Sequence, residues 1–189
     1  MGEEAAIARA RADSLRWPYT EADVRFMSTM IHHHAQAIEM AKLAPTHGAS
    51  PAIIRLSERI INAQNDEIAL MQRWLHDRHR QAPEPNPAGA PMKMDGVDHV
   101  MLMPGMLTEA QMKELAAAQG EEFDRLFLTY MIQHHRGAVS MVKELFASHG
   151  AGQDETVFKF ASDVNVDQTT EINRMLQMLL TLGVKPPAR

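Results

Sequence analysis

The sequence predicts an all-α fold: a four-helix bundle built from two repeated αα-hairpins that a long crossover linker joins. An internal repeat is the first reason, because FMSTMIHHHAQAIEMAK at residues 26–42 recurs as FLTYMIQHHRGAVSMVK at residues 127–143. The second reason is that apolar residues recur at spacings of three and four, the period typical of amphipathic helices. Neither hairpin could bury its apolar stripe alone, so the simplest fold pairs the two.

The first hairpin is expected to cover residues 20–78. Its first helix begins at Thr20, where Thr-Glu-Ala-Asp resembles a capping box, and ends before Pro45. A short turn that contains glycine, THGASP, leads into the second helix, which includes residues 53–75. Upstream of the hairpin, residues 3–15 are expected to form another short helix.

The linker is expected to cover residues 79–107, and its first half is too rich in proline to continue a helix. A short helix should follow, because Thr108 and Gln111 form a second capping box and Gly120 is a stop signal. This helix and the second hairpin together occupy residues 108–182. The whole chain, residues 1–189, is interpreted as a single domain.

Composition excludes several function classes. The net charge of -5 provides no basic field for nucleic acid or an anionic membrane surface. No apolar run approaches the roughly 20 residues of a membrane span, so membrane insertion is not expected. Cysteine is absent, which excludes disulfides, thiolate metal sites and cysteine nucleophiles. The charged start does not resemble a signal peptide, so the protein is either cytosolic or has lost its signal peptide.

Three consecutive histidines interrupt the apolar pattern of the first helix. At 100° per residue, His33 and His34 fall on either side of the midline of the apolar stripe, and both could face the core. Their counterparts in the second repeat are His134 and His135. His32 shares its side of the helix with charged and polar residues, so it is expected to be solvated.

Polar residues also lie within the buried stripe of the second helix of each repeat. These are Gln64 and Glu67 in the first repeat, and Gln168 and Glu171 in the second. A buried polar group without a partner costs about 1 to 3 kcal/mol. Folding the hairpin brings these residues opposite the histidines, so they are candidate neighbours of the imidazoles.

Pseudo-symmetry would collect imidazoles, carboxylates and thioethers in one interior. Imidazole suits copper, zinc, iron or nickel, and thioether favours Cu(I). A metal-free network that fixes helix register, with methionines that only fill gaps, is the alternative. The candidate metal ligands are Met30, His33, His34, Glu67, Met71, Met131, His134, His135, Glu171 and Met175.

The second half of the linker is rich in methionine. Its side chains have no obvious helical core to fill, so flexible Cu(I) capture and apolar docking over the bundle are both open interpretations. The residues concerned are Met92, Met94, His99, Met101, Met103 and Met106.

Several of these motifs together resemble the bacterial domain-of-unknown-function family 305. They are MIHHHAQAIEMA, the Q-x-x-E-I-x-x-M-x-x-W-L pattern that ends at Leu75, MPGM at residues 103–106, and the repeated MIQHHRGAVSM. The match covers roughly residues 20–182. The resemblance implies a ferritin-like bundle and a periplasmic or extracellular location, and some members are linked to copper binding and tolerance. Gln133 in place of His32, and the missing second tryptophan, suggest unequal half-sites.

The sequence therefore favours a non-catalytic, exported metal-binding protein. Copper is the expected ion, with another transition metal as the alternative, and a metal ion is the expected partner. A ferritin-like di-metal redox enzyme ranks lower, because each half offers only Glu67 or Glu171 and neither contains Glu-x-x-His. A metal-free structural or partner-binding bundle ranks third. The sequence leaves the oligomeric state open, including a homo-oligomer.

Overall fold

The computed structural model describes residues 18–94 and 96–184, and most of them are helical. The helix expected at residues 3–15 lies outside this part of the chain. None of the helices in the described part combines the length and the apolar character needed to cross a membrane. The long helices are α2 (Glu21–Lys42), α3 (Pro51–Asp77), α5 (Gly120–Ala147) and α6 (Glu155–Thr181).

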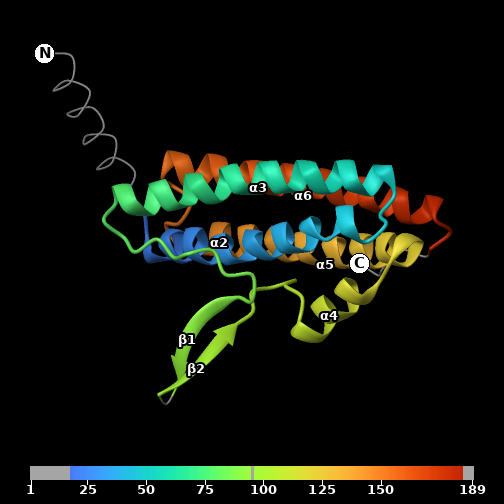
Figure 1. Cartoon of the computed structure of the whole chain (residues 1–189). Coiled ribbons are helices and arrows are strands. Elements are labelled where there is room, and N and C mark those ends of the chain that lie inside the picture. The colour runs from blue at the N-terminus through green and yellow to red at the C-terminus, as the bar shows by residue number, and fades with distance from the viewer. Residues whose placement is uncertain (1–17, 95, 185–189) are drawn as a thin grey trace, which may run out of the picture.

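These helices lie side by side in two layers (Figure 1), with α2 and α5 in one layer and α3 and α6 in the other. α2 packs along α3, α5 packs along α6, and α2 also contacts α5. A single turn of 3-10 helix, η1 (Ala44–Thr46), lies between α2 and α3. The prediction of a mainly helical protein is therefore confirmed. α2 begins as expected, because the Thr20 side chain accepts the Asp23 N–H and the Asp23 carboxylate accepts the Thr20 N–H.

A short sheet departs from the all-α prediction. β1 (Ala90–Met94) and β2 (Val97–Met101) pair antiparallel within the linker and project away from the helices (Figure 1). The sequence contains a signal for this hairpin, because Asp95-Gly96 is typical of two-residue turns. The short helix α4 (Glu109–Ala117) follows, capped by Thr108 and Gln111 as the sequence predicted.

Buried apolar side chains of the described residues form two clusters. The first cluster contains Met30 and Met71, together with Met103 and Met106 from the linker. The second contains Met131 and Met175. Of the two interpretations left open for the linker methionines, apolar docking over the bundle is therefore the one that Met103 and Met106 follow. A helical pattern reveals only the faces of helices, and these two residues lie in a loop that packs on them.

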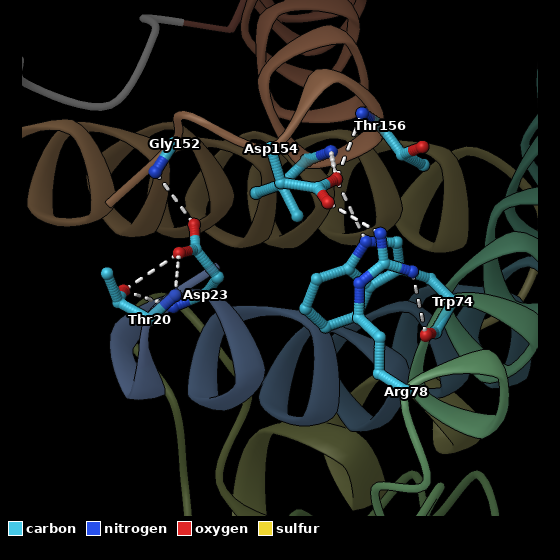
Figure 2. A network of polar contacts seen from close by, with 8 residues as sticks. Thr20, Asp23, Trp74, Arg78, Gly152, Asp154 and Thr156 are labelled. Carbon is cyan, nitrogen blue, oxygen red and sulfur yellow. Dashed lines mark hydrogen bonds and ion pairs between the residues drawn. The ribbon is translucent and has the colours of Figure 1, made fainter. Parts of the chain in front are cut away.

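Carboxylates connect the two repeats at the ends of their helices. Asp23, at the start of α2, accepts the N–H of Gly152 at 2.7 Å (Figure 2). Asp124, near the start of α5, accepts the N–H of Ser50 at 3.1 Å. Each repeat thus holds the turn of the other.

A further carboxylate joins the end of α3 to the start of α6 (Figure 2). Asp154 caps α6 by accepting the N–H groups of Thr156 and Val157. The same side chain accepts the indole N–H of Trp74 at 3.0 Å and the guanidinium of Arg78 at 2.5 Å. Asp154 is 6% exposed, so these contacts lie within the packed end of the helices.

Candidate metal centre

Four buried imidazoles form a row between the two repeats. His33 and His134 stack with their ring centroids 3.9 Å apart. The row continues at each side, since His34 lies 6.4 Å from His33 and His135 lies 6.3 Å from His134. All four side chains are 0% exposed. The row forms because α2 and α5 lie next to each other and carry the same His-His pair on the face that each turns inward.

A glutamate contacts each outer histidine of the row. The Nε2 of His34 lies 2.7 Å from a Glu67 oxygen on α3, and the Nε2 of His135 lies 2.8 Å from a Glu171 oxygen on α6. Metal-binding histidines commonly have one ring nitrogen oriented by a carboxylate while the other binds the ion. In both rings here the second nitrogen, Nδ1, is buried and has no hydrogen-bond partner in the described part of the chain.

The inner pair of histidines is held in the neutral state. Burial, reinforced by the neighbouring imidazoles, lowers the pKa of His33 to about 3 and holds the pKa of His134 well below its ordinary value. Neutral imidazole keeps a lone pair that can bind a metal. Within the described residues, Nδ1 of His33 and both ring nitrogens of His134 lack a hydrogen-bond partner. This donor set fits a late transition metal.

The outer carboxylates are accessible from a depression between α3 and α6. Its volume is about 270 Å³, and the Oε1 atoms of Gln64 and Gln168 in its wall are buried without partners in the described part of the chain. Burial, followed by the charge of nearby Glu67, raises the pKa of Asp167 at its edge. Repulsion among these carboxylates favours the approach of a cation. The acidic and amide residues that line the depression are Gln64, Glu67, Asp167, Gln168 and Glu171.

The linker covers the row from the α2 and α5 side. The carbonyl oxygen of Pro104 lies 3.0 Å from Nε2 of His33. This contact depends on a close approach of two glycines, because a Cβ atom on Gly137 would lie 1.9 Å from the Pro104 oxygen. Gly105 has φ +78°, in the left-handed region that favours glycine. The backbone of residues 103–106 therefore packs directly against α5 and covers His33.

The two repeats differ where the linker crosses them. His32 is only 4% exposed, and its Nδ1 accepts the N–H of Asn86 at 3.2 Å. The expectation that His32 is solvated is therefore wrong, because the linker covers the polar side of α2. Burial lowers the pKa of His32. At the matching position of the second repeat, the Gln133 amide donates to the carbonyl of Gly105 at 3.3 Å.

A second residue that differs between the repeats also contacts the linker. Gln36 is buried, and its amide accepts the N–H of Leu107 at 2.6 Å and donates to the carbonyls of Leu107 and Pro87. The matching residue is Gly137, which the linker contacts directly. The sequence did not identify Gln36, Pro104 or Gly137 as part of the site. Comparing the two repeats for mismatches would have identified Gln36 and Gly137.

The predicted methionine ligands belong to the core clusters. Met30 and Met71 lie in the first cluster, and Met131 and Met175 lie in the second. In the described part of the chain, no three His, Asp or Glu side chains come together in a way that could hold a metal ion. The site is therefore a row of imidazoles with a carboxylate at each end, which favours low coordination numbers over a cage of carboxylates.

Comparison with solved structures gives the chain clear relatives. A DUF305 protein from Streptomyces coelicolor, described provisionally as secreted, is 29% identical with a TM-score of 0.73, over 89% of this chain and 98% of that one. CopM in its Cu(I)-bound form is 28% identical with a TM-score of 0.63, over 84% and 96% of the two chains. A DUF305 fragment from Deinococcus radiodurans is 26% identical with a TM-score of 0.68, over 88% and 98%.

CopM has also been solved with silver and with Cu(II) bound. No curated protein matches the chain. The model of the domain of unknown function 305 matches residues 23–179. With most of its length matched, including both histidine pairs, the chain belongs to the DUF305 family.

Proposed function

We propose that this protein is an exported, non-catalytic copper-binding protein that holds Cu(I) in its interior and contributes to copper tolerance. One observation carries the proposal: a row of buried imidazoles whose ring nitrogens lack partners within the described residues. Unpaired buried polar atoms cost about 1 to 3 kcal/mol each. A bound cation would remove that cost.

The proposed ligands are imidazole nitrogens of His33, His34, His134 and His135. Cu(I) and Ag(I) are soft ions that are stable with as few as two nitrogen or sulfur ligands, so a pair of neighbouring rings suffices. Glu67 and Glu171 would orient the outer rings and balance the charge of the ion. Because the pKa of His33 is about 3, its ring is already neutral at pH 7. Binding of Cu(I) therefore does not have to displace a proton from an imidazolium.

The four methionines predicted as ligands are assigned a supporting role. Met30 and Met131 lie one helical turn before the histidine pairs, and Met71 and Met175 lie one turn after the glutamates. All four are 0% exposed. Their polarizable thioethers would keep the surroundings of a soft ion apolar and could complete its coordination.

The alternatives receive less support from the site. A di-metal redox enzyme of the ferritin-like type needs several carboxylates around each ion, whereas each half contributes one glutamate to the row. A metal-free bundle would pair its buried nitrogens internally, and several of them have no partner in the described part of the chain. The duplicated helix pairs are interpreted as a ferritin-like four-helix bundle.

The relatives favour the same function. CopM binds Cu(I), Cu(II) and silver, and the described fold of this chain resembles it over most of its length. Export to the periplasm or the medium is proposed from the Streptomyces coelicolor relative and from the redox chemistry. Outside the cytosol, cysteine ligands are exposed to oxidation. This chain contains no cysteine, so its Cu(I) site would not lose ligands in that way.

Anaerobic titration of metal-free protein with Cu(I) against a chromophoric chelator tests this function. Wild type should bind one ion in the interior, and His33→Phe/His134→Phe should lose it. Phenylalanine keeps the ring volume, so folding checked by circular dichroism should persist. His76→Ala/His149→Ala removes two exposed histidines and is the matched control. Unchanged Cu(I) affinity in the phenylalanine variant would contradict the proposal.

A further inference from the structure

The β-hairpin of the linker gathers thioether and imidazole groups on one of its faces. Met92 in β1 is paired directly with His99 in β2, so the two side chains project from the same face. Met101 lies two residues beyond His99 in the same strand and shares that face. Pro91 and Val100 form a pair on the opposite face. The strand register therefore gathers Met92, His99 and Met101 on one face, which they share with Ala90 and Val97.

The reach of these side chains allows them to meet at one point. Directly paired residues have Cβ atoms about 4.5 to 5.5 Å apart, and diagonal neighbours such as Met92 and Met101 about 7 to 8 Å. A methionine sulfur lies two bonds beyond its Cβ, and an imidazole nitrogen is similarly placed. An ion above His99 is therefore within reach of both sulfurs.

These side chains are also not used by the core. Met92 is 36% exposed and Met101 is 42% exposed, and His99 is exposed as well. Both core clusters omit all three residues. Their neighbours Met103 and Met106, by contrast, are buried in the first cluster. Met103 and Met106 therefore pack in the core, whereas Met92 and Met101 remain accessible to solvent.

We propose that Met92, His99 and Met101 form a second metal site, on the surface of the hairpin, that captures a soft monovalent ion such as Cu(I) or Ag(I). Two thioethers and one imidazole select these ions over Zn(II) and Mg(II), which prefer harder ligands. The site is separate from the interior histidines and goes beyond the proposed function. It does not require that the interior site exist.

The position of Met101 connects the hairpin with the interior. Met101 lines, together with Met103 and Met141, a cavity of about 240 Å³ between the linker and the α2 and α5 layer. The next residue after Met103 is Pro104, whose carbonyl contacts His33. Thioethers therefore occur both on the exposed face of the hairpin and in the wall of the cavity beside Pro104, whose carbonyl contacts His33.

Titration of metal-free protein with Ag(I), which undergoes no redox change, tests the site. Methionines labelled with ¹³C on the methyl group report the ions by NMR, and native mass spectrometry counts them. In wild type, the Met92 and Met101 methyl signals should shift with one Ag(I) equivalent beyond the interior one. Met92→Leu/Met101→Leu should lose that equivalent and keep the interior equivalent. Zn(II) should leave the methyl signals unmoved.

Two further variants make the result decisive. Met112→Leu/Met178→Leu removes two partly buried thioethers elsewhere and should bind as wild type does. His33→Phe/His134→Phe should keep the hairpin equivalent, and loss of the interior equivalent alone would bear only on the proposed function. Unshifted Met92 and Met101 signals, or an unchanged number of ions in Met92→Leu/Met101→Leu, would overturn the hairpin site. Both leucine variants replace side chains of similar volume, so folding is preserved.

Discussion

The imidazole of His33 lies against that of His134 with the ring centroids 3.9 Å apart, and each ring comes from a different repeat. The two copies of the motif therefore contact each other through this pair of rings. Both rings are 0% exposed, so charging either of them would place a cation in an apolar interior beside another imidazole. A metal ion bound there, as proposed, would be shared between the two rings, whereas protonating both would place two charges in the interior.

Acid should destabilise the metal-free protein through this pair. The unfolded histidines have a pKa near 6.5, whereas folding lowers the pKa of His33 to about 3 and also lowers that of His134. Between those pKa values the unfolded chain binds more protons than the folded chain. The free energy of unfolding is therefore unaffected by these two histidines above pH 6.5 and decreases as the pH falls below it. The loss is about 1.4 kcal/mol per pH unit for each histidine.

Urea unfolding with a chelator present at pH 7, 6 and 5 measures this dependence. His33→Phe/His134→Phe should show a shallower loss of unfolding free energy, since its interior has no imidazoles at these two positions. His76→Ala/His149→Ala should retain the slope of wild type. Equal slopes in wild type and the phenylalanine variant would show that His33 and His134 do not resist protonation.

Removing the charge of Glu67 should weaken interior Cu(I) binding. Glu67→Gln keeps the side-chain size but loses the carboxylate that contacts His34 at 2.7 Å, and loss of such a partner costs about 10- to 100-fold in metal affinity. Glu171→Gln should have a smaller effect, because Arg59 lies 3.6 Å from Glu171 and already offsets part of its charge. Competitive Cu(I) titration ranks the two.

The matched control for this pair is Glu58→Gln, an exposed glutamate on α3. It should leave Cu(I) affinity unchanged. Equal losses for both site variants would show that Arg59 does not influence Glu171, and no loss in either would remove the glutamates from the site.

Gly137→Ala should displace the cover over His33. An alanine usually stabilises the interior of a helix by about 1 kcal/mol relative to glycine, but its Cβ here would lie 1.9 Å from the Pro104 oxygen. The variant should therefore be less stable than wild type, and hydrogen exchange should accelerate at Met106 and Leu107. Lys143→Ala, on the exposed side of α5, should leave both measurements near wild type. A stabilised Gly137→Ala would mean that the loop does not rest on α5.

Asp154→Ala should lower the free energy of unfolding by about 2 to 4 kcal/mol. Roughly 1 kcal/mol comes from the lost cap of α6, and about 1 to 3 kcal/mol comes from leaving the buried Trp74 indole N–H without an acceptor. The matched control, Asp163→Ala on the same helix, removes an exposed contact with Lys159 and should cost less than about 1 kcal/mol. Urea unfolding compares them, and equal losses would contradict the role of Asp154.

The helices and the inward direction of the histidine pairs could be read from the sequence because both depend on local periodicity. Thr20 and Thr108 begin helices as predicted, since a capping box is complete within four residues. The glutamates opposite His34 and His135 could also be anticipated. A short turn forces neighbouring helices to lie antiparallel, which fixes which turns face each other.

The linker could not be placed in the same way. Periodicity assigns the polar side of α2 to solvent, whereas Asn86 and Leu107 lie against His32 and Gln36. No local pattern states that a segment dozens of residues away returns to that face. The contact of Pro104 with His33 has the same origin. Residues that bind the linker were therefore the ones that the sequence assigned wrongly or did not identify.

The exchange of hydrogen bonds between Asp23 and Gly152, and between Asp124 and Ser50, limits how this molecule can be divided. A fragment with one repeat would leave a buried carboxylate and a turn N–H without their partners, so each half should be less stable alone than within the whole chain. A single hairpin of this kind would meet the same requirement only by pairing with a second copy. With both hairpins in one chain the two copies need not be identical, and they differ where the linker contacts them, at His32 and Gln133 and at Gln36 and Gly137.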